Sequence, residues 1–169
     1  ALPIYWDTGQ NKPSVQVAKA ILMELAENIK TENCTFRPGV VASLFDPEFA
    51  YQSKPFKDHT IPGRILMADY DIGNQGIAYN DRVYQTVHWN DYTAWNSGYQ
   101  YRNDGVDIEL DQNGDPSIGW TDDGEWLQYT IEAAQGGDYS LQIEVASQTS
   151  SGNMRVYLDG ELINSAVET

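Results

Sequence analysis

The sequence has a single cysteine, Cys34, and only two histidines among its 169 residues. A lone cysteine excludes a disulfide within the chain and leaves the redox compartment open. Cys34 has no neighbouring base, so we expect an inert thiol. His59 and His88 stand apart from the further ligands that a zinc site needs. The sequence therefore contains neither a disulfide framework nor a histidine–cysteine metal motif.

Basic residues are also scarce: 10 lysines and arginines stand against 25 acidic residues, which gives a formal charge of −15. Too few cations are present to neutralise phosphates, which argues against a nucleic-acid partner and against an anionic membrane surface. The longest apolar stretch, residues 15–29, is interrupted by Lys19, Glu24 and Glu27, and falls short of the roughly 20 apolar residues that cross a bilayer. The composition fits an acidic extracellular protein.

Residues 1–30 predict a strand, a loop and a helix. An apolar run over residues 1–6 suits a buried strand, and residues 7–13 have turn chemistry. Ser14 is a helix N-cap, and an apolar stripe follows at helical spacing up to about Lys30. The stripe consists of Val15, Ala18, Ile21, Leu22, Leu25 and Ile29. One such unit cannot bury its own apolar faces, so we expect these residues to be a fragment of a larger α/β polypeptide.

Residues 31–62 carry several prolines and no sustained periodicity, which predicts a linker with ordered patches. From residue 63 to 169, short β-branched or aromatic runs alternate with glycine-containing turns, which predicts an antiparallel β-sandwich. The predicted strands cover Ile65 to Tyr70, Val106 to Leu110, Gly124 to Glu132, Tyr139 to Ala146 and Met154 to Leu158. Alternation in the fourth of these predicts one buried face.

Aromatic residues cluster in two places within this β-rich part. Trp120 and Trp126 flank a turn at Gly124, and Trp126 opens a predicted strand. A flat apolar ring at the edge of a β-scaffold suits the face of a sugar. Packing in the core of a sandwich is the alternative for both rings, and for Trp126 it explains the sequence at least as well. Residues 80–100 form an aromatic insertion laced with amides and carboxylates, which also suits sugar hydroxyls or packing on a neighbouring domain. Its main candidates are Trp89, Tyr92 and Trp95.

A series of motifs from about residue 61 onward resembles family 6 carbohydrate-binding modules in order and spacing. The motifs are Ile61-Pro62-Gly63, Ala68-Asp69-Tyr70-Asp71, Gly76-Ile77-Ala78-Tyr79, Tyr101-Arg102, Val106-Asp107-Ile108-Glu109, Ile118-Gly119-Trp120, Gly124-Glu125-Trp126-Leu127-Gln128-Tyr129-Thr130, Gly137-Asp138-Tyr139, Val145-Ala146-Ser147 and Leu158-Asp159-Gly160. The resemblance implies a jelly-roll β-sandwich joined to a secreted glycoside hydrolase. The implied ligands are polysaccharides such as β-glucan, xylan or agarose.

The resemblance also implies roles for particular residues. Trp120 corresponds to the aromatic wall of the family's cleft, whose second wall lies in strands that the family has beyond Asp159-Gly160; the module is therefore expected to be incomplete. The family's structural calcium is held with the help of glutamates just before the Asp-Tyr motif. Leu66 and Ala68 stand at those positions here, which leaves calcium binding open.

The first thirty residues resemble the last strand–helix unit of a (β/α)8 glycoside hydrolase such as family 5. The resembling turn is Trp6-Asp7-Thr8-Gly9, and it implies that Trp6 is a sugar platform at the catalytic face. The catalytic domain of the same polypeptide would then be a partner of the sandwich.

Acidic residues near the tryptophans do not predict catalysis. Asp122, Asp123 and Glu125 would have to straddle a glycosidic bond at about 5–9.5 Å, whereas Asp-Asp-Gly is ordinary turn chemistry. The sequence thus predicts a non-catalytic polysaccharide-binding module of a secreted glycoside hydrolase. The alternative is a structural interdomain module within an endo-acting hydrolase whose catalytic residues lie outside this chain.

Overall fold

A computed structural model describes residues 13–83, 101–102, 104–147, 152–163 and 167–168. The chain divides into two compact units, Ala1–Glu132 and Ala133–Thr169, which are treated separately below. The described part of the chain has no helix both long and apolar enough to cross a membrane.

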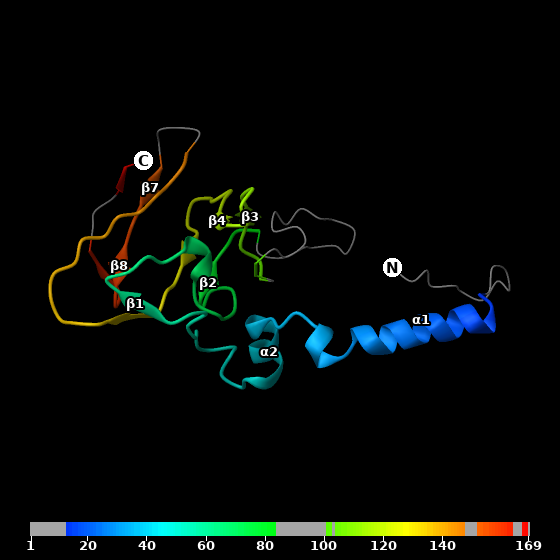
Figure 1. Ribbon diagram of the computed structural model, residues 1–169. Coiled ribbons are helices and arrows are strands. Elements are labelled where there is room, and N and C mark those ends of the chain that lie inside the picture. The colour runs from blue at the N-terminus through cyan, green and yellow to red at the C-terminus, as the bar shows by residue number, and fades with distance from the viewer. Residues whose placement is uncertain (1–12, 84–100, 103, 148–151, 164–166, 169) are drawn as a thin grey trace. The chain divides into compact units, whose positions relative to one another are not determined.

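The predicted N-terminal helix is present as α1, Val15–Asn28, and is uninterrupted along its length (Figure 1). Ser14 caps it as expected, because its hydroxyl accepts a hydrogen bond from the Val17 N–H at 3.3 Å. None of the residues of α1 is buried, and Val15 and Leu22 are 84% and 63% exposed. The apolar stripe therefore faces solvent. The strand predicted at residues 1–6 lies outside the described residues, and the barrel fragment stays a prediction.

The segment predicted as a linker contains regular structure. A 3₁₀ turn, η1 (Thr31–Asn33), precedes helix α2 (Pro38–Phe45), which begins with a proline at a position where no backbone donor is needed. Lys54 and Ile72 then exchange backbone hydrogen bonds of 2.8 and 2.7 Å, and strand β1 (His59–Ile61) follows. The last part of this segment is thus hydrogen-bonded to the region after residue 63, while the domain boundaries themselves stay a prediction.

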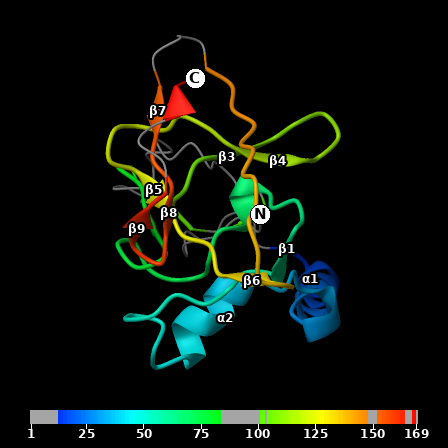
Figure 2. The ribbon, with the colours of Figure 1, turned by 90° about the vertical axis from the view of Figure 1, so that its left-hand side faces the viewer.

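Small two-stranded sheets contain the described strands between residues 59 and 133. β2 (Tyr79–Asn80) pairs with β5 (Trp126–Leu127), β3 (Ile108–Leu110) with β4 (Pro116–Ile118), and β1 with β6 (Ile131–Ala133). β3 and β4 lie side by side in Figure 2. The strand predicted at Gly124 to Glu132 is therefore split into β5 and β6. The architecture is consistent with a mainly-β module, and the jelly-roll sandwich stays a prediction.

The strand predicted at Ile65 to Tyr70 is wrong. A 3₁₀ turn, η2 (Met67–Asp69), occupies its centre, with the Asp69 N–H bonded to the Leu66 carbonyl at 2.9 Å. The physical reason is that residues 68–73 are all buried. A strand would turn every second side chain away from the core, whereas this segment buries consecutive residues by binding its two aspartates to partners.

In the second unit, β7 (Asn153–Met154) pairs with β10 (Val167–Glu168), and β8 (Tyr157–Leu158) pairs with β9 (Glu161–Leu162). Asp159 and Gly160 join β8 to β9 with φ values of 50° and 84°, as a tight hairpin turn requires. The strand predicted at Met154 to Leu158 is thus divided between β7 and β8.

The strand predicted at Tyr139 to Ala146 is wrong, and so is its buried face. Tyr139 and Leu141 are 43% and 61% exposed, and only Ile143 is half-buried. Alternation alone cannot form a strand, because each strand needs a neighbour to hydrogen-bond with. Among the described strands none pairs with this segment.

Candidate carbohydrate-binding surface

The pairing of β2 with β5 decides which way Trp126 points. Tyr79 lies opposite Leu127, and Asn80 lies opposite Trp126. Tyr79 is buried in the core and Leu127 packs against it, so the alternation of a strand turns Asn80 and Trp126 to the other face. Trp126 is 41% exposed there. The structure thus presents an indole ring beside an amide side chain.

The turn before Trp126 is held by its own polar groups. Gly124 has a φ of 88°, a conformation that favours glycine. The Glu125 carboxylate accepts from the backbone N–H groups of Asp122 at 2.8 Å and Arg82 at 2.9 Å. The Asn80 amide donates to the Gly124 carbonyl at 3.0 Å. Glu125 therefore fastens this turn to the residues after β2.

Trp120 lies just after β4 and has a backbone φ of 49°. A bulky residue in this left-handed region costs free energy and marks a site where a functional role is worth testing. The side chain of Trp120 is 50% exposed. The Gly119 N–H next to it donates to the Asp107 carbonyl at 3.1 Å, which ties the chain to β3 just before the strained residue.

The buried carboxylate of Asp71 binds the residues that follow β5. Its oxygens accept from the Thr130 N–H and the Thr130 hydroxyl, both at 2.8 Å, and from the Gln128 amide at 3.3 Å. The Asp71 N–H donates to the Gln128 carbonyl at 2.8 Å. Asp71 is fully buried, so these bonds replace its hydration shell. They join the Asp-Tyr-Asp and Gln-Tyr-Thr motifs, a link that residue spacing in the sequence did not reveal.

Arg102 holds the other side of the same segment. Its guanidinium donates to the carbonyls of Tyr70 and Asp71, and to the Asp104 carboxylate at 2.8 Å. It also lies 3.6 Å from the Tyr70 ring centroid and 4.5 Å from that of Phe56. A cation that donates hydrogen bonds and also lies over two aromatic rings links these segments to one another.

Tyrosines in this region are held in their neutral form. Burial is the main cause that raises the pKa of Tyr79 to about 12, with the negative charge of Asp104 as the second. Burial likewise raises the pKa of Tyr129, whose hydroxyl donates to the Met67 carbonyl at 2.7 Å. Both hydroxyls therefore remain protonated at neutral pH.

Comparison with known proteins bears on the second half of the chain. Residues 97–167 match the family model of the carbohydrate binding module (family 6). The match supports the resemblance found in the motifs, and this family implies carbohydrate binding. No curated protein and no solved structure matches the chain. The matched range includes Trp120 and Trp126 but leaves out residues 1–96, and with them the motifs at residues 61–79 that were also part of the resemblance.

The other aromatic candidates lie outside the described residues: Trp6, Trp89, Tyr92 and Trp95. Their roles stay predictions. The role of Trp120 as the aromatic wall of a family 6 module also stays a prediction, because the strands expected to carry the opposite wall are not among the described ones.

The calcium that family 6 modules hold near the Asp-Tyr motif is not matched by the residues present. Ala68 is fully buried among apolar neighbours, and Leu66 offers no oxygen ligand from its side chain. The part of the chain that the structure describes holds no group of three or more His, Cys, Asp or Glu side chains that could bind a metal ion. Neither position supplies a side-chain ligand for calcium, and calcium binding itself stays a prediction.

Proposed function

We propose that this chain is a non-catalytic polysaccharide-binding module that holds a secreted glycoside hydrolase on its substrate. The supporting observation is that the β2–β5 pair presents Trp126, exposed and opposite Asn80, within the range matched by the family model. An indole ring covers the C–H face of a sugar while an amide bonds its hydroxyls. Secretion of the enzyme agrees with the acidic composition.

One aromatic side chain does not supply enough free energy to bind a sugar at millimolar strength. An aromatic platform contributes on the order of 1–3 kcal/mol when a sugar covers a third to a half of its area. Millimolar binding requires about 4 kcal/mol. Trp126 therefore needs a second contributor, and Trp120 and the Asn80 amide are the described residues that suit this role. The ligand is accordingly a chain of several sugars such as β-glucan, xylan or agarose.

Affinity electrophoresis tests this proposal. Native gels containing β-glucan, xylan or agarose should retard the protein in at least one case, and Trp126→Ala should remove most of the retardation. Tyr51→Ala is the matched control, because Tyr51 is a solvent-exposed aromatic residue, 78% exposed, in the segment before β1. Normal migration of the unaltered protein in all three gels would overturn the proposal.

The second candidate is a structural module within an endo-acting hydrolase whose catalytic residues lie elsewhere. The exposed apolar stripe of α1 favours it, because such a face is normally covered by another domain. On either proposal, residues 1–169 should release no sugar from any of the three polysaccharides. Reducing-sugar release by the purified chain would contradict both.

A further inference from the structure

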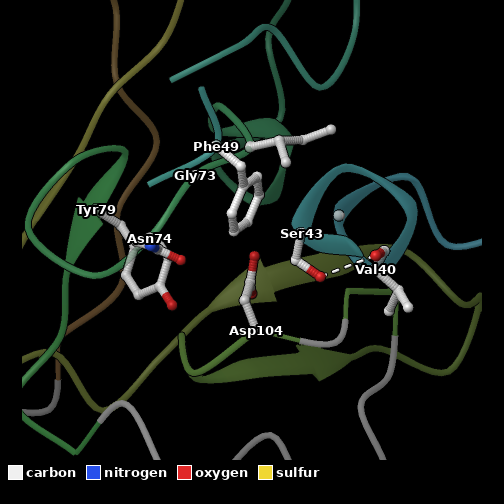
Figure 3. Close-up of a pocket in the computed structure, with 9 residues that line it drawn as sticks. Val40, Ser43, Phe49, Gly73, Asn74, Tyr79 and Asp104 are labelled. Carbon is white, nitrogen blue, oxygen red and sulfur yellow. Dashed lines mark hydrogen bonds between the residues drawn. The ribbon is translucent and has the colours of Figure 1, made fainter. Parts of the chain in front are cut away.

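A hollow of about 160 Å³ lies between α2 and the segment around β2 (Figure 3), and neither Trp120 nor Trp126 lines it. Its lining comprises Gly39, Val40, Ser43, Phe49, Ile72, Gly73, Asn74, Tyr79 and Asp104. An engineered protein cavity of about 150 Å³ holds one benzene molecule, so this hollow has room for one six-membered ring. It is smaller than the roughly 300–1,000 Å³ of sites for larger ligands, which excludes a long oligosaccharide.

The lining combines apolar and polar side chains. Phe49, Val40 and Ile72 supply apolar contact surface. Asp104 faces the same space in Figure 3, and its carboxylate is fixed by the Arg102 guanidinium at 2.8 and 3.1 Å and by the Tyr70 hydroxyl. A carboxylate has about four acceptor sites, so one remains for a ligand hydroxyl after these three bonds.

Two more polar groups have capacity for a ligand. Within the described part of the chain, the Asn74 side-chain amide has no hydrogen-bond partner, although Asn74 lines the hollow. The Ser43 hydroxyl donates to the Val40 carbonyl at 2.8 Å, which leaves the Ser43 oxygen as an acceptor. An amide that both donates and accepts, beside two acceptors, matches the hydroxyls of a polyol.

Charge restricts the class of ligand further. The Arg102 side chain is only 4% exposed and forms an ion pair with the Asp104 carboxylate. An anionic ligand would be repelled by the Asp104 carboxylate, and a cationic ligand would gain little because the carboxylate is already paired with Arg102. A neutral ligand is favoured over either.

We propose that this hollow binds one neutral pyranose ring, either a free monosaccharide or the end of a glycan chain. Asp104 and Asn74 hydrogen-bond its hydroxyls, and Phe49 contacts its C–H face. The site is built partly from α2, outside residues 97–167, and is independent of the Trp126 surface. A module with both sites would hold the interior of a polysaccharide at Trp126 and a chain end at α2.

Saturation-transfer NMR with glucose, xylose and galactose, each at about 10 mM, tests the proposal, because a single ring is expected to bind at about millimolar strength. At least one sugar should receive saturation from the protein. Asn74→Ala should weaken its binding about 3- to 10-fold, the usual effect of one lost hydrogen bond. Val40→Trp should abolish binding by filling the hollow. Neither position makes a buried side-chain hydrogen bond, and unchanged urea midpoints would verify that both variants fold.

Trp126→Ala is the matched control and should bind the monosaccharide like the unaltered protein. Conversely, Val40→Trp should still be retarded in polysaccharide gels, so failure of the two proposals is distinguishable. Absence of saturation transfer to all three sugars would overturn the inference. So would a monosaccharide signal that survives Val40→Trp or disappears in Trp126→Ala.

Discussion

The two units of this chain both contain β-rich sequence, but they bury their apolar side chains to different extents. All fully buried residues among those described lie between His59 and Ile108 in the first unit. In the second unit, apolar side chains such as Leu141, Tyr157 and Ile163 are 61%, 55% and 54% exposed. The difference teaches that an apolar pattern is buried only where polar partners and neighbouring strands fix the chain around it.

The first unit owes its order to buried polar groups as well as to apolar ones. Arg102, Asp71 and Asp69 are each at most 5% exposed, and each is bound by several partners. The Lys57 ammonium lies 3.0 Å from the Asp69 carboxylate and 5.2 Å from the Tyr101 ring centroid. No comparable set of buried polar residues occurs in the described part of the second unit.

Removal of the buried guanidinium should have the largest effect on this comparison. Arg102→Met removes the guanidinium that donates to two carbonyls and pairs with Asp104, which then keeps only the Tyr70 hydroxyl among its described donors, and should lower the free energy of unfolding by about 3–5 kcal/mol. Arg155→Met, at an exposed position in the second unit, should change it by less than about 0.5 kcal/mol. Urea unfolding followed by tryptophan fluorescence measures both, and equal losses would refute the contrast.

Truncation of a core side chain should have the next largest effect. Ile108→Ala removes an isoleucine that is 2% exposed in β3, and should cost about 2–4 kcal/mol through lost burial and the cavity left behind. Leu158→Ala in β8, where the side chain is 50% exposed, is the control and should cost well below about 1 kcal/mol. Thermal unfolding by circular dichroism compares the pair, and a larger shift for Leu158→Ala would be the opposite of what we expect.

A smaller effect should follow from loss of one hydroxyl in the Asp71 cluster. Thr130→Val keeps the shape and the backbone donor but removes the hydroxyl bond to Asp71, and should cost about 1–2 kcal/mol. Thr130→Ser, which retains the hydroxyl, should recover most of that loss. If both variants unfold at the same urea concentration, the hydroxyl bond contributes nothing to stability.

Titration of Tyr79 is the mildest test of the difference in burial between the two units. Its pKa is raised from 10.0 to about 12 in the folded chain, so folding is favoured below pH 10 and this contribution is lost as the pH rises through 12. Tyrosinate absorbance should therefore show a late-titrating component, and Tyr79→Phe should remove the part of it that titrates near pH 12. An unchanged titration curve in the variant would show that Tyr79 is not shielded from water.

Some features could be predicted locally. The helix beginning after Ser14 was predicted correctly, because a cap and a 3.6-residue apolar period act within a few turns of chain. The turn at Gly124 was likewise recognised from its residues. The strand at Ile65 to Tyr70 was predicted wrongly. Asp69 within it is paired with Lys57, 12 positions away, and Asp71 just after it is bound by Thr130, 59 positions away.

The candidate sites divide in the same way. The sequence by itself determined that Trp120 and Trp126 flank a turn in a β-rich region resembling a sugar-binding family, because ring type and turn chemistry are local properties. Only the tertiary structure decided that Trp126 faces solvent beside Asn80, since the pairing of β2 with β5 selects the face. The same holds for the hollow under α2, whose lining joins residues from positions 39 to 104. Long-range pairing and burial, which no short window of sequence contains, make those choices.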